Sequence, residues 1–271
     1  MLFRSILLAV AAFFAPLSAN PASAQDASLV SVQTPRGAKQ AFILIKPAKP
    51  TAAVILFAGG HGRLGLKSAS SMAWGKGNFL VRVRDQFAAQ GFMVAVADAP
   101  SDHQGERGMN AVFRMNAAHA ADIGAIVDYL KKQAPVPVWL VGTSMGTFSA
   151  AGGAVVLKSV DGLVLTSSIT RSKPNWNIAG SHPNGVASMR LSAVGVPTLI
   201  LSHRQDGCDI TPAADAPKLT KALTKARKVD VVLVDGGSPP RSDPCEAMSQ
   251  HGFLGIESEV VSRIAQFIKD N

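Results

Sequence analysis

The sequence has 271 residues, of which 47% are hydrophobic and 17% are charged, and its formal net charge at pH 7 is +9. This composition excludes a disordered chain and provides enough apolar residues for the large single core of an α/β domain of about 250 residues. The basic residues are scattered and have no aromatic residues between them, so nucleic acid is not expected as a partner.

The first 24 residues have the layout of a secretory signal peptide. Arg4 precedes an apolar stretch at residues 5–17, and the small residues Ala-Ser-Ala follow at 22–24. A transmembrane anchor is the alternative, but the apolar stretch is short for a span of about 20 residues. We therefore predict cleavage after Ala24 and a mature domain at 25–271. The mature protein is expected to be periplasmic or secreted, with no stable membrane insertion.

Behind this leader, short apolar runs alternate with amphipathic segments. Strands are expected over 28–34, 40–47, 52–60, 91–100, 136–142, 161–168, 196–203 and 228–237, and the first two form a hairpin. Helices are expected over 80–90, 119–132, 216–228 and 257–270, with one more of small residues after position 146. This alternation predicts a single α/β domain whose mostly parallel central sheet has helices on both faces.

Four long irregular segments follow predicted strands. They are residues 59–80, 98–114, 170–195 and 236–252. Because the carboxyl ends of parallel strands meet at one edge of a sheet, these segments are expected to gather where open α/β folds bind ligands.

A pentapeptide at the end of the strand over 136–142 carries the clearest chemical signal. Gly142-Thr143-Ser144-Met145-Gly146 matches G-x-S-x-G, in which a serine sits in a tight turn between a strand and a helix. The alternative is an ordinary strand–helix turn without chemistry. A strand before the motif and a helix rich in small residues after it are the context that a nucleophile requires, so we interpret Ser144 as a nucleophile.

With this motif, the chain resembles the α/β-hydrolase family over essentially its whole mature length. The compact, lid-poor enzymes similar to dienelactone hydrolase resemble it most. The resemblance implies a single-domain α/β-hydrolase fold. It also implies a catalytic acid and a catalytic histidine, in that order after the serine, on loops that follow later strands.

The resemblance points to Asp206 as the acid, because it lies a few residues after the strand over 196–203. Asp209 is a rival that could instead cap the next helix, as could Thr211. Asp98 precedes the serine, and Asp235 lies close to the expected histidine loop. We interpret these last two as turn residues.

The histidine of the triad is predicted to be His251. It is the only histidine after Asp206, it lies in the loop before the final helix, and a glycine follows it. His119 falls in a predicted helix, and His203 ends a strand beside the acid loop.

Acyl transfer also needs N–H donors for the oxyanion, and the resemblance implies two. One is the backbone N–H of Met145. The other comes from the glycine-rich loop at 57–65, where Gly60 and His61 are the candidates. This loop departs from the commoner His-Gly start, so the choice between the two stays open. A structural glycine-rich turn is the alternative.

The chain has two cysteines, Cys208 and Cys245, which in an exported protein predict one disulfide. Cys208 lies two residues after Asp206, and Cys245 lies six residues before His251. If the triad forms, the two loops meet, and the bridge would connect them. Two unrelated thiols are the alternative.

Together these features predict an exported serine hydrolase that cleaves a carboxylic ester through an acyl-enzyme, without a cofactor or a metal. The expected partner is a small-molecule or peptide-like acyl substrate. Peptidase or acyltransferase activity would use the same triad, and a hydrolase-like binding protein without catalysis is the alternative of another class. Four arginines of the long loops are candidates for binding an anionic substrate group, or are solvated: Arg63, Arg107, Arg114 and Arg171.

Overall fold

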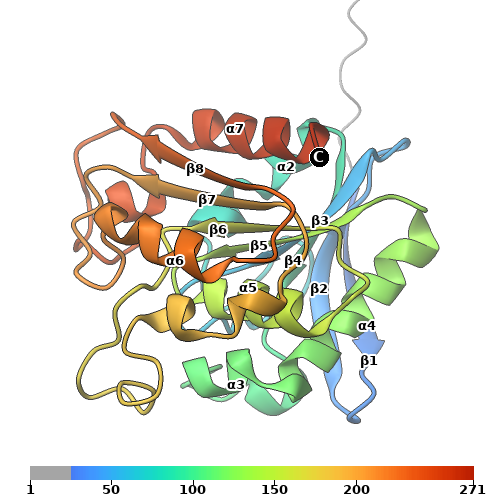
Figure 1. The fold of residues 1–271 in the computed structure, drawn as a ribbon. Coiled ribbons are helices and arrows are strands. Elements are labelled where there is room, and N and C mark those ends of the chain that lie inside the picture. The colour runs from blue at the N-terminus through green and yellow to red at the C-terminus, as the bar shows by residue number, and fades with distance from the viewer. Residues whose placement is uncertain (1–25) are drawn as a thin grey trace, which may run out of the picture.

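The computed structural model describes residues 26–271, so the predicted leader lies outside the described residues. The chain forms one eight-stranded sheet in the order β1-β2-β4-β3-β5-β6-β7-β8 (Figure 1). Its strands are β1 (Ala27–Gln33), β2 (Lys39–Ile45), β3 (Ala52–Phe57), β4 (Phe92–Ala97), β5 (Val138–Thr143), β6 (Gly162–Thr166), β7 (Thr198–His203) and β8 (Val229–Val234). β2 is antiparallel to both of its neighbours, and the other strand pairs are parallel.

Helices cover both faces of this sheet (Figure 1). On one face lie α1 (Phe79–Arg82), α2 (Arg84–Ala89) and α7 (Glu257–Lys269), whose buried side chains share one core cluster. The other face carries α3 (Ala111–Met115), α4 (Ala117–Gln133), α5 (Gly146–Val156) and α6 (Ala216–Ala222). No helix among residues 26–271 combines the length and the apolar character that crossing a membrane requires.

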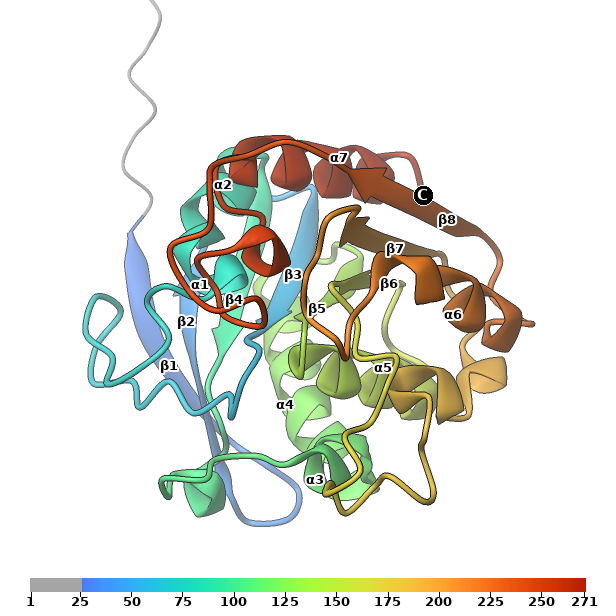
Figure 2. The ribbon, with the colours of Figure 1, turned by 90° about the vertical axis from the view of Figure 1, so that its left-hand side faces the viewer.

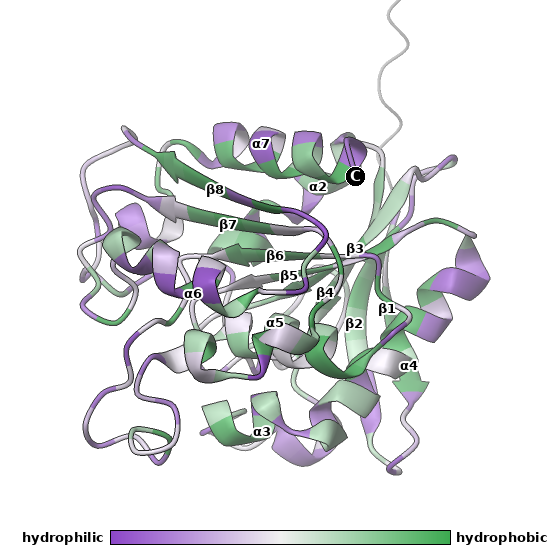
Figure 3. Cartoon of the chain, viewed as in Figure 1, coloured by the Kyte–Doolittle hydropathy of each residue, from purple (hydrophilic) through white to green (hydrophobic). Residues whose placement is uncertain are grey.

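The central strands are buried on both faces, which explains their continuous apolar runs. Every residue of β3, β4, β5, β6 and β7 is buried, whereas the edge strands β1 and β8 keep exposed positions. Figure 3 shows the same contrast, with hydrophobic strands at the centre and hydrophilic outer faces on α4 and α7. The predicted fold class therefore follows from burial of a parallel sheet between two helical layers.

Two predicted helices differ from the structure. The helix over 80–90 is broken at Val83, where ψ is 6°, into α1 and α2. Val81 and Val83 are both buried. A regular surface helix buries side chains along one stripe only, and the break allows this segment to bury additional side chains. The helix over 216–228 ends at Ala222, because Leu223 turns into the core before the chain reverses into β8.

The parallel strands β3, β4, β5, β6, β7 and β8 end at one edge of the sheet, which faces the viewer in Figure 2. The segments that follow these strands meet there, as the sequence predicts. They include the four long predicted segments, which follow β3, β4, β6 and β8, and the segments after β5 and β7.

Candidate active site

The turn between β5 and α5 holds Ser144 in a strained conformation. Its φ is +52°, in the left-handed region that side chains rarely adopt. A Cβ on Gly142 would overlap the carbonyl oxygen of Gly146, and a Cβ on Gly146 would overlap that of Phe57. Both glycines of the motif are therefore required by close backbone approach, and the turn has the strained strand–turn–helix geometry that the motif predicts.

Hydrogen bonds fix the peptide that joins Ser144 to Met145. The Ser144 carbonyl oxygen accepts from the Thr147 N–H at 2.9 Å and from Thr147 Oγ1 at 2.5 Å, and the Ser144 N–H donates to Thr166 O at 3.1 Å. In a trans peptide the N–H points away from the carbonyl. Within residues 26–271 the Met145 N–H has no hydrogen-bond acceptor, which leaves it free for a ligand.

His251 and Asp206 lie together, as the sequence predicts. His251 Nδ1 is 3.0 Å from Asp206 Oδ2, and both side chains are buried. His251 and Ser144 line the same cavity, which has a volume of about 560 Å³. No hydrogen bond joins these two side chains in the described part of the chain. Ser144 and His251 therefore share the cavity without direct contact by hydrogen bond, and Asp206 is buried against His251 and does not line the cavity.

Thr211 completes the surroundings of the acid. Its hydroxyl donates to Asp206 Oδ2 at 2.9 Å and lies 3.1 Å from His251 Nδ1, while the other oxygen of Asp206 accepts from the Cys208 N–H at 3.0 Å. The sequence suggests a helix cap for Thr211, and the structure gives it this contact instead. Its spacing from Asp206 is an ordinary loop spacing, so no local signal identifies it.

The end of β6 supports both the elbow and the histidine loop. Thr166 accepts the Ser144 N–H, and its hydroxyl donates to Gly142 O at 3.0 Å. Ser167 is buried with φ +42°, and its hydroxyl donates to the carbonyl of His251 at 2.8 Å. Sequence analysis misses Ser167, because a serine after a strand is common and carries no distinguishing pattern.

The rival acids have other contacts. Asp98 is buried and accepts the N–H groups of Leu64, Gly65, Leu66 and Ala99, so it organises the glycine-rich loop. Asp235 forms a surface ion pair with Arg204. Asp209 is exposed and lies beside the disulfide. Of the four aspartates, Asp206 is the one that contacts His251.

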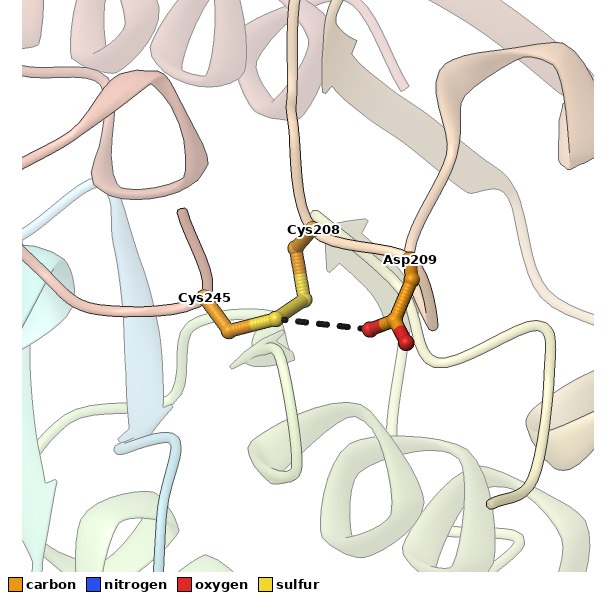
Figure 4. Close-up of side chains that lie close together, drawn as sticks. All are labelled: Cys208, Asp209 and Cys245. Atoms are coloured by element: carbon orange, nitrogen blue, oxygen red, sulfur yellow. Dashed lines mark hydrogen bonds between the residues drawn. A yellow bond between two sulfur atoms is a disulfide. The ribbon is translucent and has the colours of Figure 1, made fainter. Parts of the chain in front are cut away.

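The predicted disulfide is present between Cys208 and Cys245, whose Cα atoms are 4.5 Å apart. Figure 4 shows Asp209 beside it, with Oδ1 at 3.7 Å from Cys245 Sγ. Both sulfurs are in the disulfide, so the three residues cannot offer thiolates to a metal. The bridge connects the acid loop to the segment that leads to His251.

The glycine-rich loop after β3 lies against the elbow. A Cβ on Gly59 would be 3.0 Å from the Cβ of Ser144, and Gly60 and His61 line the same cavity as Ser144. Neither the Gly60 N–H nor the His61 N–H has an acceptor within residues 26–271. Both predicted donors are therefore placed at the cavity, and the structure leaves both open to a ligand.

The His61 ring is held in this loop by its neighbours. It packs on Trp74 with ring centroids 4.1 Å apart, and its Nδ1 accepts the Arg63 N–H at 3.1 Å. Burial lowers the pKa of His61, and the positive charges of Arg63 and Arg114 lower it further. The ring is therefore neutral at pH 7.

Arg114 is buried beneath the same loop, although the sequence suggests a surface or substrate-binding role. Its guanidinium donates to Gly60 O at 3.1 Å, to Ser149 Oγ at 2.9 Å and to Met109 O at 3.4 Å. Burial lowers its pKa to about 9, so it stays protonated at pH 7. None of the ion pairs within residues 26–271 includes it. Arg114 therefore anchors the loop through neutral acceptors.

The chain matches no protein-family profile and no curated protein sequence. Solved structures are similar to it over nearly the whole length. The esterase Pf2001 of Pyrococcus furiosus has 18% identity and a TM-score of 0.61, covering 91% of this chain and 93% of its own. The α/β hydrolase GrgF of Penicillium has 14% identity and a TM-score of 0.64, covering 90% and 98%. The dienelactone hydrolase of Anabaena variabilis has 15% identity and a TM-score of 0.59, covering 91% and 98%.

The protein therefore has the α/β-hydrolase fold, in a single domain. This confirms the fold class predicted from the sequence. The fold alone does not assign a role to Ser144, His251 and Asp206, because one fold hosts many functions and the site decides among them.

The contact of Thr211 with Asp206 gives a first prediction. Thr211→Val keeps the shape of the buried side chain and removes the hydroxyl, so Asp206 loses one donor. With p-nitrophenyl acetate as the test substrate, we expect kcat to fall about tenfold, since hydrogen bonds to charged groups contribute roughly 1.5–3 kcal/mol. Thr211→Ser keeps the hydroxyl and is the control. Equal kcat in both variants would show that the hydroxyl does not position the acid.

The disulfide gives a second prediction. It closes a loop with a sequence separation of 37, for which the chain-entropy model gives a stabilisation of about 4 kcal/mol. We expect the Cys208→Ala, Cys245→Ala double variant to melt on the order of 10 °C lower. Calorimetry of this variant, and of the wild type with and without a reductant, provides the measurement. A melting temperature that neither change moves would contradict it.

The third prediction concerns Arg114. Arg114→Met removes the donors to Gly60 O and Met109 O while filling a similar volume. We expect kcat to fall about tenfold, a loss of roughly 1.4 kcal/mol, because the loop is no longer anchored. Arg114→Lys should restore part of it. Arg63→Met removes a charge from the same loop and should leave kcat unchanged; a similar loss there would mean that charge alone matters.

Proposed function

We propose that this protein is a serine hydrolase that cleaves a carboxylic ester. The observation that carries the proposal is the 3.0 Å contact between His251 Nδ1 and Asp206 Oδ2 at the cavity that Ser144 lines from its strained turn. Nucleophile, base and orienting acid are the three parts that acyl transfer by a serine needs. The esterase and hydrolase names of the structural neighbours support the same reaction class.

In this proposal His251 Nε2 takes the proton of the Ser144 hydroxyl as its oxygen attacks the ester carbonyl. Asp206 holds the imidazole by Nδ1 and stabilises its charged form. The negative charge that develops on the carbonyl oxygen is bound by the Met145 N–H and by the N–H of Gly60 or His61. His251 then returns the proton to the leaving alkoxide, which leaves an acyl group on Ser144.

Water completes the cycle through the same proton transfers, with water as the attacking group and Ser144 as the leaving group. His251 takes a proton from the water as its oxygen attacks the acyl carbonyl, and the carboxylic acid leaves as Ser144 regains its proton. No step in this scheme uses a cofactor or a metal. The substrate is a small-molecule or peptide-like acyl compound, and nucleic acid is not proposed as a partner.

We also propose that the protein acts after export, with the leader removed after Ala24. The disulfide between Cys208 and Cys245 supports an oxidising compartment such as the periplasm or the cell exterior. The layout of residues 1–24 supports the same location.

The experiment is labelling with a fluorophosphonate probe, together with hydrolysis of p-nitrophenyl acetate. We expect labelling and turnover in the wild type and neither in Ser144→Ala. Ser181→Ala is the control, since Ser181 lies outside the cavity although its hydroxyl is 2.9 Å from a histidine nitrogen, His182 Nδ1. Turnover that survives Ser144→Ala, or a folded wild type that neither labels nor turns over, would contradict the proposal.

A further inference from the structure

A second cavity adjoins the one that holds Ser144 and His251. Its volume is about 380 Å³, and it shares Gly60, His61 and Met145 with the first cavity. Both volumes fall within the range of about 300–1,000 Å³ that is usual for small-molecule sites. The shared residues are those proposed to bind the oxyanion, so a substrate held at Ser144 has room on both sides of its carbonyl group.

The walls of the second cavity carry no charged side chain, and they combine apolar side chains with three asparagines. Met109 and Val112 lie on one side, and Trp176 and Ile178 come from the loop after β6. The remaining lining residues supply amides and backbone, with no lysine, arginine or carboxylate among them. The one titratable residue is His61, whose pKa is lowered by burial and by nearby positive charges. A charged group in this cavity would find no opposite charge to compensate its desolvation.

The arginines that the sequence offered for an anion lie elsewhere. Arg114 is buried, and Arg171 pairs with Asp215 at 2.8 Å. Arg63 donates to the Gln104 carbonyl, and Arg107 lines a separate hollow. None of these four residues lines either of the two adjoining cavities. The strong positive charge of the chain therefore does not extend into the cleft.

The position of His251 assigns the two cavities to the two halves of an ester. His251 lines the first cavity and not the second. The leaving oxygen must lie beside His251, because this residue returns the proton to it. The alcohol half of the ester therefore occupies the first cavity. The second cavity shares the proposed oxyanion donors but does not include His251, so the acyl half of the ester would occupy it.

We infer that the second cavity is a subsite for an uncharged, apolar acyl chain, so that the substrates are neutral esters of aliphatic or similar apolar acids. This inference rests on the proposed ester hydrolysis and adds the substrate class. Val112 supports the assignment, since it is 48% exposed and presents an apolar side chain at this cavity.

The test compares p-nitrophenyl esters of acetate, butyrate and pentanoate with the mono-p-nitrophenyl ester of glutarate. We expect kcat/KM to rise roughly fifteenfold from acetate to butyrate, at about fourfold for each of the two buried methylenes. Glutarate differs from pentanoate by a terminal carboxylate, and it should be slower by at least about tenfold.

A charge placed at Val112 sharpens the test. Val112→Lys should shift the ratio of glutarate to pentanoate hydrolysis about tenfold toward glutarate, by losing apolar contact and adding an opposite charge. Val156→Lys is the matched control, because Val156 is an equally exposed helical valine at the far end of α5 that lines neither cavity. It should leave the ratio unchanged.

The failures of the two proposals are distinguishable. If acetate is hydrolysed with dependence on Ser144, but chain length has no effect and Val112→Lys does not move the ratio, the acyl subsite is wrong and the hydrolase stands. If no ester is hydrolysed, the proposed function fails. In that case binding of hexanamide, measured by saturation-transfer NMR and weakened by Val112→Lys, still supports the apolar subsite, and absence of such binding overturns it.

Discussion

The site depends on the close approach of the β5–α5 turn to the end of β3. Gly146 lies so near the Phe57 carbonyl that a methyl group would not fit, and Gly59 meets Ser144 from the other side. Because of this approach, the turn at Ser144 packs against the glycine-rich loop, and Met145 lines the same cavity as Gly60 and His61. The positive φ of Ser144 is kept because the buried parallel strands around it leave the turn no alternative.

A second set of contacts joins the acid and histidine loops, which are far apart in the chain. Asp206 contacts His251 directly, Thr211 lies against both, and the Cys208–Cys245 disulfide links the two loops covalently. These contacts differ in kind, so they respond differently to conditions. Reduction removes the covalent link and leaves the hydrogen bonds in place.

The distribution of charge separates the outer surface from the cleft. The chain carries a formal charge of +9, yet no lysine or arginine lines either of the two adjoining cavities, and Glu246 lines the first. Arg114 is buried near the site, and its guanidinium is directed at the Gly60 carbonyl. A buried cation in that position stabilises the loop and is not accessible to a substrate. Selectivity in the cleft is therefore expected to follow shape and apolar contact.

The sequence by itself determined the parallel α/β sheet and the tight turn at Ser144, whereas Asp206 and His251 were predicted from the resemblance to the α/β-hydrolase family. These features are local, since buried strands need continuous apolar runs and a tight turn needs flanking glycines. Only the tertiary structure decided the contacts of Thr211, Ser167 and Arg114 and the presence of the second cavity. Thr211 and His251 are 40 residues apart, Ser167 and His251 are 84 apart, and Arg114 and Gly60 are 54 apart. Such contacts depend on how distant segments of the chain pack. The sequence also does not distinguish a buried arginine from an exposed one.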